Sequence, residues 1–186
     1  QSGSDRVLKE MRRSYRSAKF LGIIERVRAA MPEAAITTDI IVGFPGETDE
    51  DFDATLDMVR DVAFDHAFTF IYSPREGTSA AALTDSVPRA LAQKRFDRLA
   101  QLVRELSFAS NEREIGAVRA CLIEGSSKRD ESVLSARTPE NRLVHVPVDS
   151  AHTACALAGT VADIRITGAH PWFLTGELAG RPVSES

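Results

Sequence analysis

The stretch from residue 36 to residue 48, ITTDIIVGFPGET, constrains the fold most strongly. A nearly continuous run of β-branched residues is typical of a strand covered on both faces of a parallel sheet. The run leads into a turn with two glycines and a proline, and then into TDEDF, which reads as the start of a helix. Thr48 is the predicted N-cap, because the acids after it favour the positive end of a helix dipole. Strand, turn and helix together are the unit with which α/β proteins build binding sites.

Other segments extend this unit in both directions. Apolar residues at helical spacing predict helices over residues 17–31, from Thr48 onward, and from Pro88 to about residue 114. Residues 67–72, AFTFIY, predict a second strand. Strands that alternate with helices indicate an α/β fold with a parallel sheet. Two strands make a thin core, and the chain begins QSGSDRV without Met, so we expect a fragment or a processed product.

The three predicted helices have apolar and polar faces. The apolar positions are Phe20, Ile24, Val27 and Met31 in the first, Phe52, Leu56 and Val59 in the second, and Phe96, Leu99, Val103 and Leu106 in the third. A basic row is predicted on the outer face of the third helix, formed by Arg89, Lys94, Arg95, Arg98 and Arg104. Such a row is either a solvated face or a surface for RNA.

The pattern changes after residue 115. Short apolar runs alternate there with turn residues, in the order AVRACLIEG, SVLSAR, RLVHVPV, GTVADIRITGA and WFLTGEL. Five short strands at close spacing predict a small antiparallel barrel or sandwich. We therefore predict a domain over residues 1–114, a second over residues 115–179, and a polar tail over residues 180–186.

Composition excludes several classes of protein. The chain is 43% hydrophobic and 27% charged, as in ordinary folded soluble proteins, and no apolar run is long enough to predict a membrane helix. The formal net charge of −4 means that an RNA surface would be a local patch.

Cys121 and Cys155 lack partners at metal-ligand spacing, so they are predicted as buried or half-buried thiols in a cytoplasmic protein. The four histidines, His66, His145, His152 and His170, are predicted as structural or exposed.

Two turns lie where ligands of α/β sheets bind, beyond the carboxyl ends of the predicted strands. Residues 43–47 form either a structural turn or a ligand-lining one, and one interpretation of Glu47 is a simple cap for the next helix. Residues 72–78 form the second turn. Neither a P-loop nor a dinucleotide fingerprint is present. A third turn, in ARTPENRLVHV, carries Arg137, Asn141 and Arg142, which could hold phosphates and base edges, although Asn141 could equally stabilise the turn.

Five strings carry a family resemblance, in the order QSGSDRVLKEMRRSY, TTDIIVGFPGETDEDF, AFTFIYSPREGT, ARTPENRLVHV and ITGAHPWFLTGEL. Together they resemble the C-terminal half of the tRNA methylthiotransferases, and most closely the branch that acts on N6-isopentenyl-adenosine beside the anticodon. The resemblance implies the end of a radical SAM partial barrel followed by a TRAM domain, a small OB-like barrel that binds RNA. The implied reaction of the parent enzyme inserts sulfur and a methyl group at C2 of the adenine.

The resemblance also implies cofactors and partners. The parent enzyme uses S-adenosylmethionine and two 4Fe-4S clusters, and its partner is the tRNA anticodon stem-loop. The CxxxCxxC motif is absent here, and two lone cysteines cannot replace it, so the fragment alone is predicted to be inactive and to hold no metal. No catalytic residue is predicted within it.

Particular residues are implied to contact these ligands. Gln1 and Ser2 would sit at the end of a truncated strand that faces S-adenosylmethionine, and the full cofactor-binding set is Gln1, Ser2, Gly43, Phe44, Gly46, Glu47, Tyr72 and Ser73. The RNA-binding set is Arg137, Asn141 and Arg142.

The chain departs from the family pattern at two positions. Ala136 stands where the family often has Gly, and Glu76 where it often has Pro. An alanine would restrict the turn if a positive φ were required there. Two other hypotheses stay open: a fragment of a methylthiotransferase for a ribosomal protein, and a stand-alone RNA-binding module. The sequence predicts no membrane association and leaves the oligomeric state undetermined.

Overall fold

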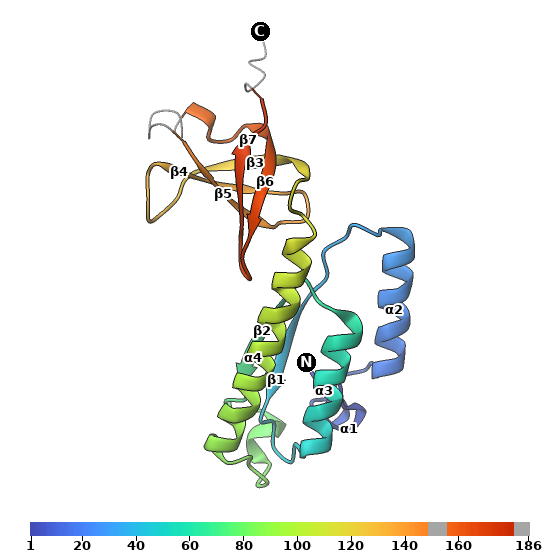
Figure 1. The fold of residues 1–186 in the computed structure, drawn as a ribbon. Helices are drawn as coiled ribbons and strands as arrows, with labels where there is room; N and C mark the ends of the chain where they lie inside the picture. Colours follow the sequence, from blue (N-terminus) through green and yellow to red (C-terminus); the bar gives the residue numbers. More distant parts are fainter. Residues whose placement is uncertain (149–155, 181–186) are drawn as a thin grey trace. The chain divides into compact units, whose positions relative to one another are not determined.

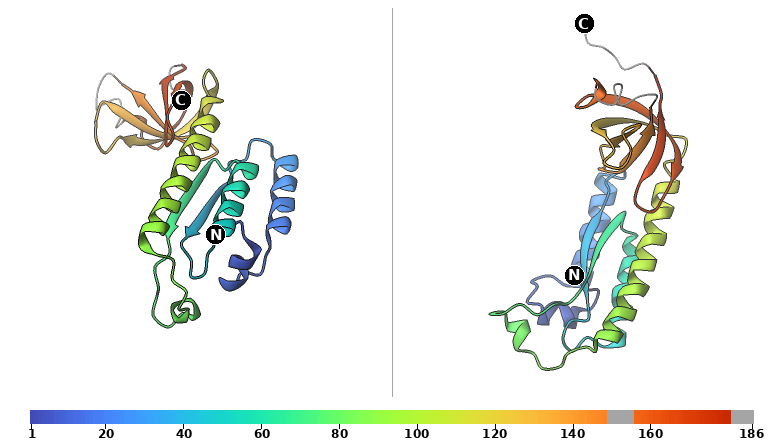
Figure 2. Two further views of the ribbon diagram at one scale, coloured as in Figure 1. Left: turned by 60° about the horizontal axis from the view of Figure 1, so that its bottom comes forward. Right: turned by 90° about the vertical axis from the view of Figure 1, so that its left-hand side faces the viewer.

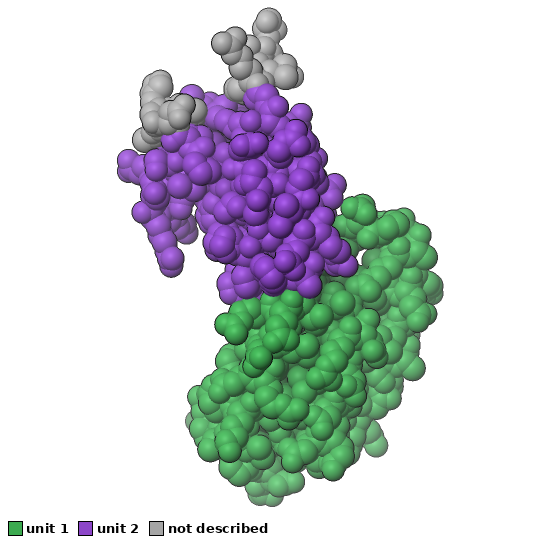
Figure 3. Space-filling view, in the orientation of Figure 1, with its two compact units in different colours: residues 1–106 green, residues 107–186 purple. Residues whose placement is uncertain are grey.

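The computed structural model describes residues 1–148 and 156–180. The chain forms two compact units, residues 1–106 and residues 107–186, which are coloured separately in Figure 3. The elements labelled in Figure 1 are α1 (Asp5–Glu10), α2 (Ser17–Ala30), β1 (Thr37–Val42), α3 (Asp49–Val62), β2 (His66–Ile71), a 3-10 turn (Ser79–Ala82), α4 (Arg89–Glu112), β3 (Val118–Ser126), β4 (Val133–Arg137), β5 (Leu143–Pro147), β6 (Val161–Ala169) and β7 (Leu174–Leu178). The predicted division at residues 114 and 115 stays a prediction, because α4 contributes residues to both units.

The first unit is built on a parallel pair of strands. β1 and β2 pair in parallel, with Thr37 opposite His66 and Val42 opposite Ile71. Figure 2 shows α3 and α4 on one side of these strands. Side chains from that side of the sheet pack with the two helices into one core, formed by Ile40, Val42, Ala67, Phe52, Leu56, Val59, Leu99 and Val103 among others. The predicted α/β arrangement with parallel strands is therefore confirmed.

Helix α3 begins where the sequence predicts. The Thr48 hydroxyl accepts a hydrogen bond from the Asp51 amide at 3.3 Å, and the Asp51 carboxylate accepts one from the Thr48 amide at 2.9 Å. This reciprocal capping box satisfies two amides that a helix start otherwise leaves without partners. It also sets the direction in which the chain leaves the glycine turn.

Two details of the predicted helix faces are wrong. Met31, placed on the apolar face of the first helix, is 55% exposed, because α2 ends at Ala30 and the side chain beyond it is not directed at the core. Arg95, placed on the solvated row of α4, is only 3% exposed. A carboxylate from the glycine turn pairs with Arg95, and helical spacing alone cannot reveal such a partner.

The second face of the sheet is open. Phe68 is 55% exposed and Phe70 is 51% exposed, although both lie within β2. The residues that pair with them on β1 are Asp39 and Ile41, respectively. The expectation of a strand covered on both faces therefore fails within the residues that the structure describes, where the helices cover one face only.

Residues from 118 onward form a closed five-stranded barrel in the order β3, β4, β5, β7, β6. Alternate residues of each strand point inward, which gives a buried core formed by Cys121, Ile123, Leu134, Ala136, Val144, Val146, Ile164, Ile166 and Leu174, together with Leu157 and Ala162. All five predicted strands are confirmed. Inward and outward alternation along each strand is the pattern that closes a small barrel around its own side chains.

The barrel is not wholly antiparallel. β5 and β7 run in parallel, with Val144 opposite Leu174 and His145 opposite Thr175. A closed ring with an odd number of strands cannot alternate in direction all the way round, so at least one neighbouring pair must be parallel. The prediction of an antiparallel barrel holds for the four other pairings and fails at this one.

Within the described residues, no helix is both long enough and apolar enough to span a bilayer.

Candidate functional site

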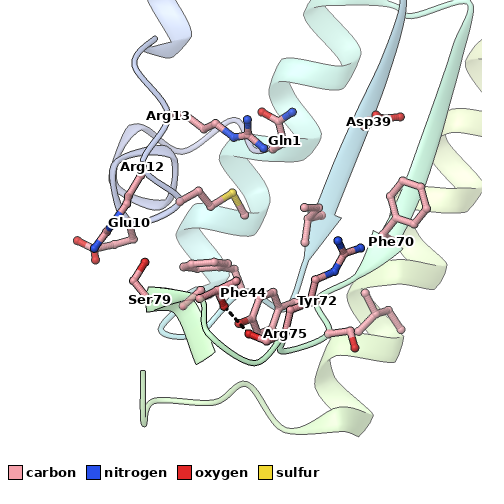
Figure 4. Close-up of a pocket in the computed structure, with 16 residues that line it drawn as sticks. Gln1, Glu10, Arg12, Arg13, Asp39, Phe44, Phe70, Tyr72, Arg75 and Ser79 are labelled. Atoms are coloured by element: carbon pink, nitrogen blue, oxygen red, sulfur yellow. Dashed lines mark hydrogen bonds between the residues drawn. The ribbon is translucent and has the colours of Figure 1, made fainter. Parts of the chain in front are cut away.

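A cavity of about 600 Å³ lies at the carboxyl ends of β1 and β2, entirely within the first unit. Ile41 and Phe44 come to it from the end of β1, and Ile71, Tyr72 and Ser73 from the end of β2. The other lining residues are Gln1, Glu10, Met11, Arg12, Arg13, Asp39, Phe70, Arg75, Thr78, Ser79 and Ala80 (Figure 4). This is the edge at which open α/β sheets bind their ligands.

Aromatic rings form one wall of the cavity. The rings of Phe44 and Tyr72 meet edge to face with their centroids 5.2 Å apart. The Tyr72 hydroxyl is buried, and it has no hydrogen-bond partner among the described residues. A buried hydroxyl without a partner costs about 1–3 kcal/mol, so this atom marks a place where a polar ligand group would fit.

Gln1 reaches the cavity from the outer edge of β1. Its carbonyl oxygen accepts a hydrogen bond from the Ile41 amide at 3.0 Å, as a neighbouring strand would. Its side-chain oxygen accepts one from the Tyr15 hydroxyl. Of the predicted cofactor-binding residues, Gln1, Phe44, Tyr72 and Ser73 are thus brought together around this cavity.

Ser2 lies elsewhere. It lines a separate hollow of about 40 Å³, and its hydroxyl lies 3.2 Å from the Thr55 hydroxyl of α3. The Gly3 amide also donates to the Thr55 hydroxyl, at 3.0 Å. A Cβ at Gly3 would lie 2.2 Å from the Ala54 carbonyl oxygen, so only glycine allows this close approach to α3. Ser2 and Gly3 therefore pack the chain against a helix.

The turn after β1 depends on its glycines for backbone geometry. Gly43 has a φ of +71° and Gly46 a φ of +74°, values that favour glycine. Gly43 lines a second cavity of about 240 Å³, together with Ala92 and Arg89 of α4. Gly46 donates its amide to the Asp85 carbonyl at 2.6 Å. The turn thus places Phe44 in the main cavity, while Gly43 and Gly46 do not line it.

The buried carboxylate of Glu47 stabilises this turn through hydrogen bonds. Its carboxylate accepts hydrogen bonds from the Gly43 amide at 3.0 Å and from the Arg95 guanidinium at 2.7 Å. Arg95 also donates to the Glu47 carbonyl at 3.0 Å and to Asp49 at 2.7 Å. Burial raises the pKa of Glu47, while the Gly43 amide and Arg95 oppose that shift. The carboxylate is therefore engaged within the turn and does not line the cavity, and the cap of α3 is Thr48.

Several cavity residues were not predicted from the sequence. Arg12 and Arg13 follow α1, a short helix that the hydrophobic pattern does not predict. Arg75 lies in the predicted turn over residues 72–78, and Asp39 lies within β1. MRRSY and SPREGT lie within the strings that carry the family resemblance, but a linear sequence does not reveal that both line one cavity.

The barrel turn between β4 and β5 contains the three residues predicted to contact RNA. Asn141 has a φ of +65°, so it serves the turn in the way that asparagine commonly does. Arg137 lies 3.3 Å from the Glu124 carboxylate and donates to the Asn141 carbonyl at 3.2 Å. Arg142 donates to Asn111 at 2.6 Å and to Ser110 at 3.1 Å, both near the end of α4. Arg142 is thus an anchor of the hairpin within the second unit.

Comparison with known proteins finds a different match for each part of the chain. Residues 1–59 match the radical SAM superfamily, and residues 112–179 match the TRAM domain. A tRNA-2-methylthio-N(6)-dimethylallyladenosine synthase of Nocardia farcinica is 53% identical over 187 residues, which cover 98% of this chain and 36% of that protein. Synthases of the same name from Kineococcus radiotolerans and Streptomyces coelicolor are 49% and 50% identical, over 95% and 96% of this chain and 35% of each relative.

The chain belongs to the tRNA methylthiotransferase family.

It spans about a third of the length of these methylthiotransferase relatives, 35% to 36%. The radical SAM superfamily implies S-adenosylmethionine and iron–sulfur clusters in the longer enzyme. The two ligands fit this chain very differently. The cavity, with its aromatic wall and the buried Tyr72 hydroxyl, suits part of a nucleoside-like cofactor.

An iron–sulfur cluster does not fit the residues present. Cys121 is buried in the barrel core, and burial raises the pKa of its thiol to about 11. Cys155 and His152 lie outside the described residues. Across residues 1–148 and 156–180, no group of three or more His, Cys, Asp or Glu side chains is placed to hold a metal ion. His145 and His170 instead contact the ring of Phe173, with centroids 5.1 and 4.3 Å away.

The two departures from the methylthiotransferase pattern are accommodated. Ala136 is buried within β4 opposite Val144, in extended backbone, so the restriction that a positive φ would impose does not arise. Glu76 is exposed and is not one of the residues that line the 600 Å³ cavity.

Proposed function

We propose that this chain is part of an enzyme that methylthiolates C2 of N6-isopentenyl-adenosine next to the anticodon of tRNA. The observation that carries the proposal is the cavity at the ends of β1 and β2, in a chain that is 49% and 53% identical to two of the named synthases over 95% and 98% of its length. Within that enzyme the chain supplies a wall of the S-adenosylmethionine site and an RNA-binding barrel. It does not act alone.

The cofactor-facing residues divide into two groups under this proposal. Gln1, Phe44, Tyr72 and Ser73 contact the cofactor directly, because they line the cavity. Ser2, Gly43, Gly46 and Glu47 hold these residues in place through the α3 contact and the glycine turn. S-adenosylmethionine supplies the radical and methyl-transfer chemistry in such enzymes. The residues here bind and orient it, and no step through a cluster is assigned to them.

The RNA side of the proposal rests on the TRAM match over residues 112–179. Arg137 is the residue of the barrel turn best placed for an RNA phosphate, since its partner Glu124 is exposed and a surface ion pair is weak. Asn141 and Arg142 support the turn that presents it. The division into residues 1–114, 115–179 and a tail, the anticodon stem-loop as partner and a cytoplasmic setting belong to this proposal.

A chimera tests the proposal directly. This chain would replace the matching segment of the Nocardia farcinica synthase, and nucleosides from isopentenylated tRNA would be identified by mass spectrometry after reaction. We expect the methylthio nucleoside from the chimera. A Phe44→Ala chimera should lose most of that product, because Phe44 is 3% exposed and supports the ring of Tyr72 at the cavity.

Controls separate function from folding. A Met31→Ala chimera, altered at an exposed position outside the cavity, should keep the activity. A folded, cluster-loaded chimera that binds S-adenosylmethionine but never methylthiolates this tRNA would contradict the proposal. Product on a ribosomal protein instead of tRNA would favour the alternative substrate.

A further inference from the structure

Three arginine side chains line the cavity from different sides. The guanidinium groups of Arg12, Arg13 and Arg75 line it, along with the carboxylates of Glu10 and Asp39 (Figure 4). Three positive groups against two negative ones leave a local excess of positive charge on a chain whose formal net charge is −4. Local positive charge of this kind is where an anion binds to an otherwise acidic protein.

None of these three guanidinium groups donates a hydrogen bond to another residue that the structure describes. Within residues 1–106, seven of the twelve arginines donate a side-chain hydrogen bond to the protein, namely Arg6, Arg16, Arg26, Arg28, Arg60, Arg95 and Arg98. The remaining five are Arg12, Arg13, Arg75, Arg89 and Arg104. Three of those five line one cavity, although they come from two segments about 60 residues apart in the chain.

The backbone at Arg12 adds a second observation. Its φ is +56°, and its amide donates to the Lys9 carbonyl at 2.9 Å as the chain leaves α1. The position is therefore a left-handed helix end, where glycine is the favoured residue. The turn does not account for an arginine here, whereas the place of its side chain on the cavity wall does.

The shape of the cavity indicates which anion it suits. Arg12, Arg13 and Arg75 are exposed, while Phe44 is buried and Tyr72 half-buried. The charged groups thus lie at the exposed rim together with the ring of Phe70, whereas Phe44 and Tyr72 lie deeper. Guanidinium groups bind phosphates, so exposed arginines around the opening suit a polyanion whose phosphates stay outside the part of the cavity assigned to the cofactor. A single carboxylate would not need three separate cations.

We propose that Arg12, Arg13 and Arg75 form a phosphate-binding rim for an RNA strand that enters this cavity. The proposal rests on the proposed function for the identity of the polymer, and it adds an RNA contact in the first unit to the one proposed for the barrel. Arg12 and Arg13 would act from the end of α1, and Arg75 from the turn after β2.

Salt dependence of RNA binding tests the rim. The dissociation constant of this chain for a fluorescein-labelled RNA hairpin would be measured over a series of salt concentrations. The R12Q/R13Q/R75Q triple variant should bind the hairpin at least about tenfold more weakly at low salt. The magnitude of its slope of log affinity against log salt should decrease by about 2 to 3, because each phosphate contact contributes roughly 0.7–0.9 to that slope. The R12K/R13K/R75K variant should keep most of the slope, because lysine still acts as a point charge on phosphate.

A matched control removes the same charge elsewhere. Lys19, Arg26 and Arg60 are exposed and lie outside the cavity, so K19Q/R26Q/R60Q should leave the slope nearly unchanged. Competition identifies the anion: inorganic pyrophosphate should displace the hairpin from the wild type more effectively than acetate at matched ionic strength.

Three results would overturn the proposal: no hairpin binding by the wild type at low salt, an unchanged slope in the Gln variant, or an equal loss in the control. Displacement by acetate as effective as that by pyrophosphate would assign the rim to a carboxylate. The chimera assay is independent of these outcomes, because it measures product and not the affinity of this chain. If the Gln variant kept the salt slope of the wild type while the chimera made the methylthio nucleoside, only this inference would be rejected.

Discussion

At Gly43 two separate constraints meet on one residue. Its φ is +71°, and a Cβ built there would lie 2.8 Å from the Cβ of Ala92 on α4. The first constraint concerns the local backbone, and the second concerns the packing of a helix that lies far along the chain. Together they explain why the turn that presents Phe44 begins with glycine.

The two constraints can be separated by mutation. Gly43→Ala should reduce the free energy of unfolding by about 2–4 kcal/mol, from backbone strain and overpacking combined. Adding Ala92→Gly removes the clash but not the strain, so it should rescue part of the loss. Urea denaturation at neutral pH measures both variants. A full rescue would show that packing alone matters, and no loss in the single variant would contradict the geometry.

Asp51 shows how a carboxylate stabilises the start of a helix. It accepts hydrogen bonds from the Thr48 amide at 2.9 Å and the Ser4 hydroxyl at 2.5 Å, and it pairs with Arg6. Burial acts to raise its pKa, but the bonds from Arg6, Ser4 and Thr48 outweigh burial and hold the pKa well below its usual range. The ionised form is therefore the stabilising one.

This pKa direction predicts a pH dependence. Because the folded-state pKa lies below the unfolded value, Asp51 stabilises the protein fully above about pH 4, and that stability is lost as the pH falls through the folded-state pKa. Asp51→Asn should cost about 1–3 kcal/mol at pH 7. The gap between variant and wild type should narrow in urea titrations below about pH 4. A gap that is constant down to acid unfolding would contradict this assignment.

At the scale of elements, β2 has two faces with different roles. Ala67 is buried against the helices, whereas Phe68 and Phe70 are half exposed on the open side. The neighbouring strand follows the same alternation, with Ile40 buried and Asp39 exposed. The helices thus stabilise one face, and the cavity forms against the other.

Substitutions on the two faces should differ sharply. Phe68→Thr should change the free energy of unfolding by less than about 0.5 kcal/mol, because an exposed side chain loses few contacts. Ile40→Ala should cost about 2–5 kcal/mol, because it leaves a cavity in the core. Thermal and urea unfolding of this chain compare the two. Comparable costs would mean that the open face is covered in solution.

The two arginines of the hairpin between β4 and β5 have different hydrogen-bond partners. Arg142 bonds to Asn111 and Ser110, whereas Arg137 bonds to an exposed glutamate and to its own turn. The first contact joins the barrel hairpin to the end of α4, and the second stays on the surface.

This division predicts opposite phenotypes. Arg142→Ala should destabilise the second unit by about 1–3 kcal/mol, because it leaves buried partners unsatisfied. Arg137→Ala should leave the melting temperature nearly unchanged but weaken RNA-hairpin binding and reduce the salt slope by about 1. Differential scanning fluorimetry and fluorescence anisotropy provide the two readouts. A stable Arg142→Ala variant with wild-type unfolding would contradict the anchoring role.

At the scale of the whole molecule, the chain joins an incomplete sheet to a complete barrel. The barrel closes on itself, so all five of its strands have neighbours on both sides. The sheet has two strands and an open face, and relatives about three times as long supply more chain. Among the described residues, every barrel strand thus has two neighbouring strands, whereas the two-stranded sheet leaves one face uncovered.

The isolated chain should therefore hold no cluster. After anaerobic incubation with iron and sulfide and removal of the excess, we expect far less iron than one cluster per chain, because a cluster needs several thiolates around one centre. Iron analysis and absorption spectra measure this, with the Nocardia farcinica synthase as the positive control. Stoichiometric cluster iron that survives desalting would contradict the proposed role of this chain.

Local pattern alone determined much of this protein. The strand and capped helix around residues 36–62, the core positions of α3 and α4, and the five barrel strands all follow from periodicity and turn chemistry, because each of these signals lies within a few neighbouring residues. The resemblance carried by five short strings then pointed to the family, which the comparisons support.

Only the tertiary structure decided the partners of individual side chains. Arg95 lies on the helix face predicted to be solvated but pairs with Glu47, and Arg142, which is predicted to contact RNA, donates hydrogen bonds to Asn111 and Ser110. Arg12 and Arg75 likewise meet at one cavity from separate segments. Such contacts join residues tens of positions apart. The periodicity of apolar residues along a sequence predicts which positions face the core, but it does not predict which distant side chain each of them contacts.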